Sequence, residues 1–210
     1  MPAAASPRMA GPPIALRSGM TIYRDIILGL WLLFAGYWAV SAIGVKRSVG
    51  GWAWRRQVAV RLIIALGIVV ALRNHAIAHA VRQAWFFAAD VHPPLAVPGV
   101  VLCAFGIGLA IAARRYLGRN WGLPMSRKED AELVTRGPYA VIRHPIYTGI
   151  LLALLGSAIG DGLFWLLPLV LAGAYFIVSA RREEKLMCAQ FPQQYPAYMK
   201  RTRMLLPFLL

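Results

Sequence analysis

The chain has 210 residues, 59% of them hydrophobic, and carries 23 Lys and Arg against 8 Asp and Glu, a formal net charge of +15. It is too apolar for an ordinary soluble domain, and its length allows one domain or a single helix bundle. The basic residues flank apolar runs, so an anionic membrane surface is a better partner than nucleic acid. The two cysteines, Cys103 and Cys188, provide neither a disulfide framework nor a zinc-type pair.

The N-terminal part of the sequence predicts a disordered tail followed by a membrane helix. Residues 1–19 are rich in Ala, Pro, Gly and Ser, and prolines interrupt the apolar stretches that a signal peptide would need. Residues 20–210 are expected to form a single membrane-embedded domain. Its first span is Ile26–Val45, whose 20 uncharged residues suffice to cross a hydrocarbon core of ~30 Å.

The next region holds a short second span and a segment with two histidines. Val58–Leu72 is the second expected span, and its Arg61 can extend to the basic side of the membrane. In the following segment, residues 73–94, His75 and His79 are four residues apart, which on a helix places them on one face. A metal site would need a third ligand, and none is evident in the sequence. We therefore expect an interfacial amphipathic segment and no bound metal.

Three further apolar runs complete the expected bundle. Leu95–Ala113 is the third span, and its Gly106 and Gly108 favour close helix packing. Ile146–Ile159 and Leu163–Ala180 are the fourth and fifth spans, and only a Gly-Asp-Gly turn separates them. A turn this short predicts an antiparallel helical hairpin. No breaker follows the fifth span, so its helix is expected to project from the membrane.

The most informative stretch is RGPYAVIRHPIYTG, residues 136–149, which lies between two apolar helices. Its Gly-Pro pair ends the preceding segment, and Pro145 suits the first turn of a new helix, where a missing N–H costs nothing. Arg143 and His144 therefore lie at a helix N-terminus, the end that favours anions. The alternative is a plain turn whose basic side chains touch lipid headgroups.

The expected hairpin also brings an acidic pair to this motif. Glu183 and Glu184 follow the fifth span, and the two ends of a hairpin are neighbours. They should lie within reach of Arg143, His144 and Tyr147 at the membrane boundary, where charges usually have a partner or a ligand. The alternative is a solvated helix turn that is neutralised by the basic residues around it.

The distribution of basic residues predicts the orientation of the bundle. With five spans, 18 of the 23 Lys and Arg fall on the side that holds the central polar loop and the C-terminal tail, and 5 fall on the other. The positive-inside bias then places the N-terminus outside and the C-terminal tail in the cytosol. In a bacterium this would be the inner membrane.

These motifs together resemble the isoprenylcysteine carboxyl methyltransferase family, and their arrangement is also similar to that of phospholipid N-methyltransferases. The resemblance covers Arg114 to Pro207 and rests on Leu117, Gly118, Trp121, Gly122, Gly137, Pro138, Tyr139, Arg143, His144, Pro145, Tyr147, Gly149, Glu183, Glu184, Phe191, Tyr195 and Tyr198. The first two spans carry no matching motif.

The resemblance implies an integral membrane methyltransferase that uses S-adenosylmethionine (AdoMet). The residues that it assigns to the cofactor are Tyr139, Arg143, His144, Pro145, Tyr147, Glu183, Glu184, Gly106 and Gly108. Arginine suits the carboxylate of AdoMet and a glutamate suits its amine or sulfonium. Candidates for holding or activating the methyl acceptor are Glu184 and the arginines Arg181, Arg201 and Arg203.

The expected fold is therefore an all-α membrane bundle of about five transmembrane helices with a C-terminal cytosolic helix extension. Its partners would be the lipid bilayer and a lipid-like or prenylated acceptor that enters laterally, with the aromatic tail 191–198 as a lid over the cofactor. Carboxyl methylation is the first expectation, because a carboxylate is already ionised at neutral pH. Alternatives are methylation of a lipid amine with His144 or a glutamate as base, a sterol-reductase-like enzyme that uses NADPH, and a scaffold with a decayed site.

Overall fold

The computed structural model describes residues 14–41, 93–118 and 132–205, and within these residues the protein is all-helical, as expected. One isolated parallel bridge joins Ile142 to Arg203. The helices are α1 (Ile14–Ser41), α4 (Pro93–Leu117), α5 (Pro145–Gly160), α6 (Leu166–Gln190) and α7 (Gln194–Arg201), with the short 3-10 helices η2 (Gly137–Ala140) and η3 (Leu163–Trp165).

Three helical segments are long and apolar enough to cross a membrane: Ile22–Ser41, Pro94–Leu117 and Leu163–Gln190. The fourth apolar helix, α5, is shorter, with 16 residues. These four helices correspond to four of the five expected spans, and α6 extends beyond the apolar run as predicted. The expected second span, Val58–Leu72, and the two spaced histidines lie outside the described residues.

The first helix differs from its expected bounds. It begins at Ile14, so residues 14–19 belong to the helix and not to the tail that composition suggested. The physical reason is local: after the proline pair that ends at residue 13, no proline occurs within the helix, so the backbone can remain hydrogen-bonded through its polar first turns.

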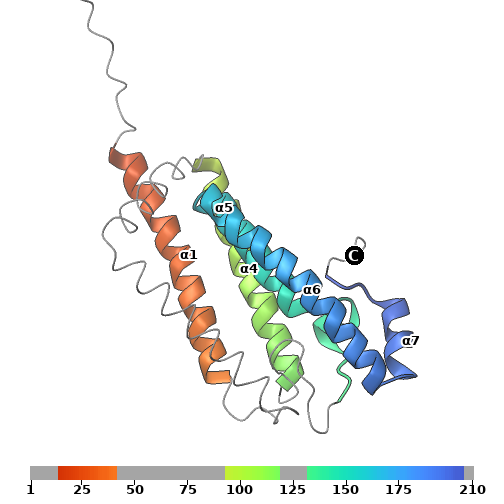
Figure 1. The fold of residues 1–210 in the computed structure, drawn as a ribbon. Coiled ribbons are helices and arrows are strands. Elements are labelled where there is room, and N and C mark those ends of the chain that lie inside the picture. Colours follow the sequence, from red (N-terminus) through yellow and green to blue (C-terminus); the bar gives the residue numbers. More distant parts are fainter. Residues whose placement is uncertain (1–13, 42–92, 119–131, 206–210) are drawn as a thin grey trace, which may run out of the picture.

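The centre of the bundle is a tight contact between α4 and α5, with α1 beside α4 and α6 beside α5 (Figure 1). A Cβ added at Gly106 would lie 2.4 Å from the backbone nitrogen of Ala153, and one added at Gly156 would lie 2.3 Å from that of Cys103. Only glycine therefore lets the two backbones approach this closely. The packing role expected for Gly106 is the one that the structure gives it.

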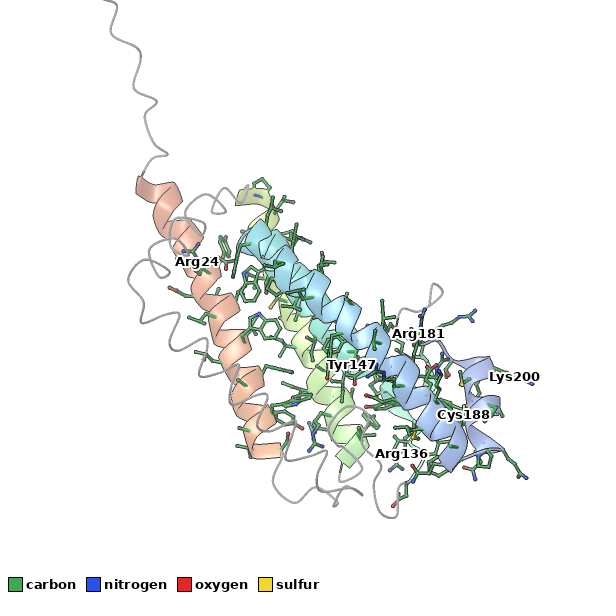
Figure 2. All side chains as sticks on the ribbon, viewed as in Figure 1. Arg24, Arg136, Tyr147, Arg181, Cys188 and Lys200 are labelled. Carbon is green, nitrogen blue, oxygen red and sulfur yellow. The ribbon has the colours of Figure 1, made fainter. Side chains whose placement is uncertain are left out.

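The end of the bundle where α5 meets α6 through η3 is joined to α1 by polar side chains. The Arg24 Nε donates to Asp161 at 2.8 Å, and the Trp165 indole donates to the same carboxylate at 2.8 Å. Two turns further along α1, the Trp31 indole donates to Ser157 at 3.0 Å and stacks on Trp165. This network fixes α1 on the hairpin at the end opposite residues 136–149, the RHP motif (Figure 2).

The outer faces of the long helices are apolar. Large hydrophobic side chains that are mostly exposed include Ile22, Ile26, Leu28, Leu32, Leu33, Val40, Leu95, Val97, Val101, Phe105, Leu167, Val170, Leu171 and Val178. An apolar surface of this extent is rare on a soluble monomer, whereas in a bilayer it contacts lipid chains. The described helices are thus those of an integral membrane protein.

Candidate functional site

The RHP motif turns sharply because of its glycine and its two prolines. Gly137 adopts φ +61°, and a Cβ there would come within 2.6 Å of the Tyr116 ring. Gly137 and Pro138 begin η2, and Pro145 is the first residue of α5, with His144 as its N-cap. The expected helix start is therefore confirmed, and it places the side chains of Arg143 and His144 at the end of α5.

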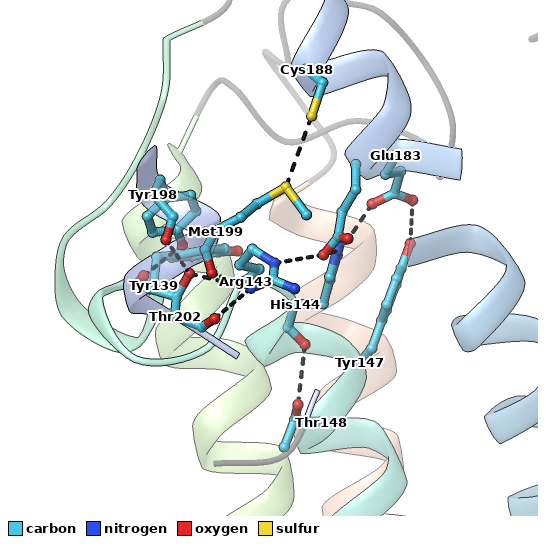
Figure 3. Close-up of polar contacts among 11 residues, drawn as sticks. Tyr139, Arg143, His144, Tyr147, Thr148, Glu183, Cys188, Tyr198, Met199 and Thr202 are labelled. Carbon is cyan, nitrogen blue, oxygen red and sulfur yellow. Dashed lines mark hydrogen bonds and ion pairs between the residues drawn. The ribbon is translucent and has the colours of Figure 1, made fainter. Parts of the chain in front are cut away.

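The hairpin of α5 and α6 brings the acidic pair onto this end, as the sequence predicted (Figure 3). The Arg143 Nε lies 2.6 Å from the Glu184 carboxylate, and the Tyr147 hydroxyl donates to Glu183 at 2.5 Å. The Arg143 and Glu184 side chains are only 9% and 11% exposed, so both charges are largely removed from water. A buried pair of this kind depends on each partner, because either charge alone would be left uncompensated.

His144 lies between the two glutamates. Its Nδ1 is 3.5 Å from a Glu183 oxygen and its Nε2 is 3.4 Å from a Glu184 oxygen. Its ring stacks on Tyr147, which in turn stacks on Phe176 of α6. Burial alone would lower the pKa of His144, but the two neighbouring carboxylates outweigh burial and raise its pKa above the usual value. The two carboxylates therefore favour the imidazolium form of this side chain.

Arg143 also binds the C-terminal segment of the chain. Its Nη1 contacts the carbonyl oxygens of Met199 at 3.3 Å and Thr202 at 2.5 Å. Among the described residues, hydrogen bonds from Arg143 involve Nε and Nη1, and none involves Nη2. The Nε and Nη1 groups thus donate to protein acceptors, and the two N–H groups of Nη2 are available to a ligand.

Backbone hydrogen bonds clip residues 202–205 against the motif. The Arg143 N–H donates to the Arg203 carbonyl at 2.7 Å, and the His144 N–H donates to the Met204 carbonyl at 3.1 Å. The Thr148 hydroxyl donates to the Leu205 carbonyl. Thr148 and Thr202 carry no charge or aromatic ring, so no signal in the sequence identified them as site residues.

Helix α7 closes over the motif through two buried tyrosines. The Tyr198 hydroxyl donates to the backbone carbonyl of Tyr139 at 2.6 Å, and Tyr195 is 4% exposed. Burial raises the pKa of Tyr198 to about 12, so this hydroxyl keeps its proton at neutral pH. The aromatic tail therefore lies over the cluster, at the place where the sequence predicted a lid.

The structure gathers seven of the expected site residues: Tyr139, Arg143, His144, Pro145, Tyr147, Glu183 and Glu184. Gly106 instead packs against the α5 backbone, and around Gly108 nothing lies within 4 Å of an added Cβ. Arg181, Arg201 and Arg203 are exposed, and the Arg201 guanidinium lies 5.9 Å from the centre of the Tyr198 ring. In the described part of the chain, no group of three His, Cys, Asp or Glu could hold a metal ion.

The segment of sequence that builds this cluster matches a known protein family. Residues 95–194 match the family described as phospholipid methyltransferase. The match covers 100 of the 210 residues, just under half of the chain. It spans α4, the motif, the α5–α6 hairpin and the start of α7, which are the elements that build the cluster. The family resemblance expected from the motifs is thus confirmed.

Two curated proteins are similar to the same half of the chain. The cobalt-zinc-cadmium resistance protein CzcN of Cupriavidus metallidurans is 34% identical over 106 residues, which are 49% of this chain and 47% of CzcN. The nickel-cobalt-cadmium resistance protein NccN of Alcaligenes xylosoxydans xylosoxydans is 31% identical over 106 residues, covering 49% of each. The chain therefore aligns with about half the length of the curated relatives it matches.

A solved structure shares the fold. The eukaryotic intramembrane Ras methyltransferase ICMT (isoprenylcysteine carboxyl methyltransferase) superposes with a TM-score of 0.52 and 24% sequence identity. The match covers 64% of this chain and 54% of that protein. The all-helical membrane architecture derived from the sequence is thereby confirmed.

Proposed function

We propose that this protein is an integral membrane methyltransferase that uses AdoMet and methylates a lipid-like or prenylated acceptor. The observation that carries the proposal is the cluster of Arg143, His144, Glu183 and Glu184 at the end of the α5–α6 hairpin, in which all side chains but that of Glu183 are largely buried. Buried charges at the end of a membrane bundle are costly, and they are typical of sites that bind polar ligands. The family that residues 95–194 match is described as a methyltransferase family, which supports methyl transfer as the reaction.

The chemistry of the cluster fits AdoMet. Glu183 and Glu184 offer carboxylates to the amine and the sulfonium, and the Nη2 of Arg143 offers two N–H groups to the carboxylate. The aromatic tail beside the cluster offers ring faces to adenine. When bound, AdoMet would supply an electrophilic methyl group on a positively charged sulfur. The residues of the chain would orient it and exclude water, which is the main requirement for an in-line displacement.

A carboxylate remains the first candidate for the acceptor. It is ionised at neutral pH and needs no base, whereas the two carboxylates beside His144 raise its pKa and favour its protonated form, which cannot accept a further proton. In this role, Arg181, Arg201 or Arg203 would anchor the acceptor at the exposed edge of the site, and Glu184 would hold Arg143 and His144 in position.

A lipid amine is the second candidate, because the matching family is described by its phospholipid substrates. An ammonium group must lose a proton before it can accept a methyl group, so this reaction would require a carboxylate such as Glu183 as base. The acceptor would reach the site laterally from the bilayer, with α7 covering the cofactor from the cytosol.

The proposal is tested first by cofactor binding. Purified protein in detergent should melt at a higher temperature in the presence of AdoMet but not of NADPH, since a ligand that binds only the folded state stabilises it. Stabilisation by NADPH alone would favour the reductase alternative. Membrane extracts incubated with methyl-labelled AdoMet and analysed by mass spectrometry should then yield a labelled lipid ester or a labelled lipid amine, which identifies the acceptor class.

A further inference from the structure

The unusual feature of the cluster is that a buried histidine lies between two carboxylates. His144 is 8% exposed, its Nδ1 lies 3.5 Å from Glu183, and its Nε2 lies 3.4 Å from Glu184. In the described part of the chain the buried Nε2 makes no hydrogen bond, so its contact with Glu184 is an electrostatic one. The titratable or charged groups around it are Glu183 and Glu184 from α6, Tyr147 from α5, Tyr195 and Tyr198 from α7, and Tyr139 and Arg143 from the motif itself.

Arg143 and a protonated His144 both face the acidic pair. Arg143 is paired with Glu184, and His144 lies beside both glutamates. Burial raises the pKa values of Tyr195 and Tyr198, so these tyrosines stay neutral at physiological pH. A cationic ligand placed beside the glutamates would therefore lie close to the imidazolium and repel it.

We propose that His144 is a protonated counter-ion of the Glu183–Glu184 pair and that it releases its proton to solvent when the sulfonium of the methyl donor binds there. This inference rests on the proposed use of AdoMet. A positive charge close to an imidazolium disfavours its protonated form, and loss of the proton removes the repulsion. In the free protein the two carboxylates raise the pKa of His144 above its usual value, which increases the fraction that carries a proton at pH 6.5.

The affinity for AdoMet should change with pH in a definite direction. Because binding lowers the pKa of His144, the complex holds fewer protons than the free protein, and affinity for AdoMet rises with pH. The rise is at most tenfold per pH unit, and it ends above the pKa that His144 has in the free protein. S-adenosylhomocysteine provides a matched probe, because it keeps the adenosine, amine and carboxylate but its sulfur is uncharged. Its affinity should lack this dependence.

The experiment is isothermal titration calorimetry of the full chain in detergent at pH 6.5, in buffers of different ionisation enthalpy. We expect AdoMet to release more protons than S-adenosylhomocysteine, by at most one per site. Titrations in which both ligands bind and release equal numbers of protons would overturn the inference while leaving the methyltransferase proposal intact. Absence of AdoMet binding at every pH would overturn both.

Two further measurements assign the proton to His144. His144→Gln should abolish the difference between the ligands, whereas His92→Gln, a control outside the cluster motif, should retain it. Because His144→Gln can fail to fold, nitrogen-15 NMR of histidine-labelled wild-type protein provides an independent readout. One imidazolium signal should convert to a neutral ring on addition of AdoMet and remain charged with S-adenosylhomocysteine. An imidazolium that stays charged with both ligands would contradict the assignment.

Discussion

The residues of the cluster have separable roles because each side chain contacts different partners. Arg143 joins α6 to the C-terminal segment, His144 lies between the two glutamates, and Tyr147 orients Glu183. The sequence predicted that these side chains meet, but it assigned Arg143 only to the cofactor. The structure adds an internal role, since most of its hydrogen bonds are made to the protein itself.

Glu184→Gln should weaken AdoMet binding at least tenfold and lower the melting temperature. The substitution removes one partner of a buried ion pair, a change that typically costs about 3–5 kcal/mol. Lys185→Gln, one residue further along α6, is the matched control, because Lys185 is exposed and its loss should change stability by less than about 1 kcal/mol. Equal melting temperatures and affinities for the two variants would contradict a role for Glu184 in the site.

His144 should make stability depend on pH in the free protein. Its pKa in the folded state is raised, so its contribution to stability is complete below the pKa of the unfolded chain, about 6.5, and is lost as pH rises through the folded-state value. We therefore expect the wild type to melt at progressively lower temperature over this interval above pH 6.5. This decrease in melting temperature with pH should be absent in His144→Gln. Parallel pH profiles of melting temperature in the two proteins would contradict a contribution of His144 to stability.

At the scale of elements, two contacts position the site: the α4–α5 glycine interface and the clip formed by residues 202–205. The first fixes α5 against the bundle, and the second fixes the C-terminal segment against the first turn of α5. Both contacts are made by backbone groups, so side-chain chemistry alone could not predict which residues form them.

Gly106→Ala should destabilise the protein by roughly 1–3 kcal/mol, the usual cost of overpacking, because its Cβ would overlap the α5 backbone. Gly108→Ala is the control on the same helix. Nothing lies within 4 Å of a Cβ there, so the higher helix propensity of alanine should stabilise by about 1 kcal/mol. Thermal melts in detergent would compare the two, and a similar loss in both would argue against the interface. If Gly108→Ala also weakens AdoMet binding, the cofactor role suggested by the family resemblance gains support.

Removal of residues 191–210 should abolish AdoMet binding while the apolar helices remain inserted. The truncation deletes α7 and the carbonyl groups that hold Arg143, so the guanidinium loses its orientation. Membrane fractionation would check insertion, and calorimetry would check binding. Tyr198→Phe removes only the hydrogen bond to Tyr139 and should have a milder effect. A truncated protein that binds AdoMet as the wild type does would show that the tail is not a lid.

For the whole molecule, the two ends of the bundle differ in character. One end is fixed by the Arg24–Asp161 pair and stacked tryptophans, and the other carries the cluster and the exposed basic residues of α6 and α7 (Figure 2). An excess of Lys and Arg marks the cytosolic side of a membrane protein. The site would then face the compartment in which AdoMet is made and consumed.

A reporter fused after Leu210 should accordingly be active only in the cytosol. Alkaline phosphatase, which matures outside the cytosol, and a fluorescent protein, which matures inside, provide a complementary pair of fusions in a bacterial host. We expect fluorescence without phosphatase activity. Phosphatase activity without fluorescence would reverse the proposed orientation and place the cluster on the outer side of the membrane.

The sequence alone predicted four of the described helices and the meeting of the motif with the acidic pair. Apolar length predicted the helices, Pro145 predicted the start of α5, and the short turn before the fifth span predicted the hairpin that unites Glu184 with Arg143. These signals are local, because helix length, proline geometry and turn length act over a few residues.

The tertiary structure decided how these groups are paired. It directed Arg143 to Glu184 and to the carbonyl of Thr202, set His144 between two carboxylates, and assigned Gly106 to helix packing. Such pairings depend on the rotation of α6 about its axis and on the path of the chain after α7. Both are set by packing between residues far apart in sequence, which no local pattern encodes.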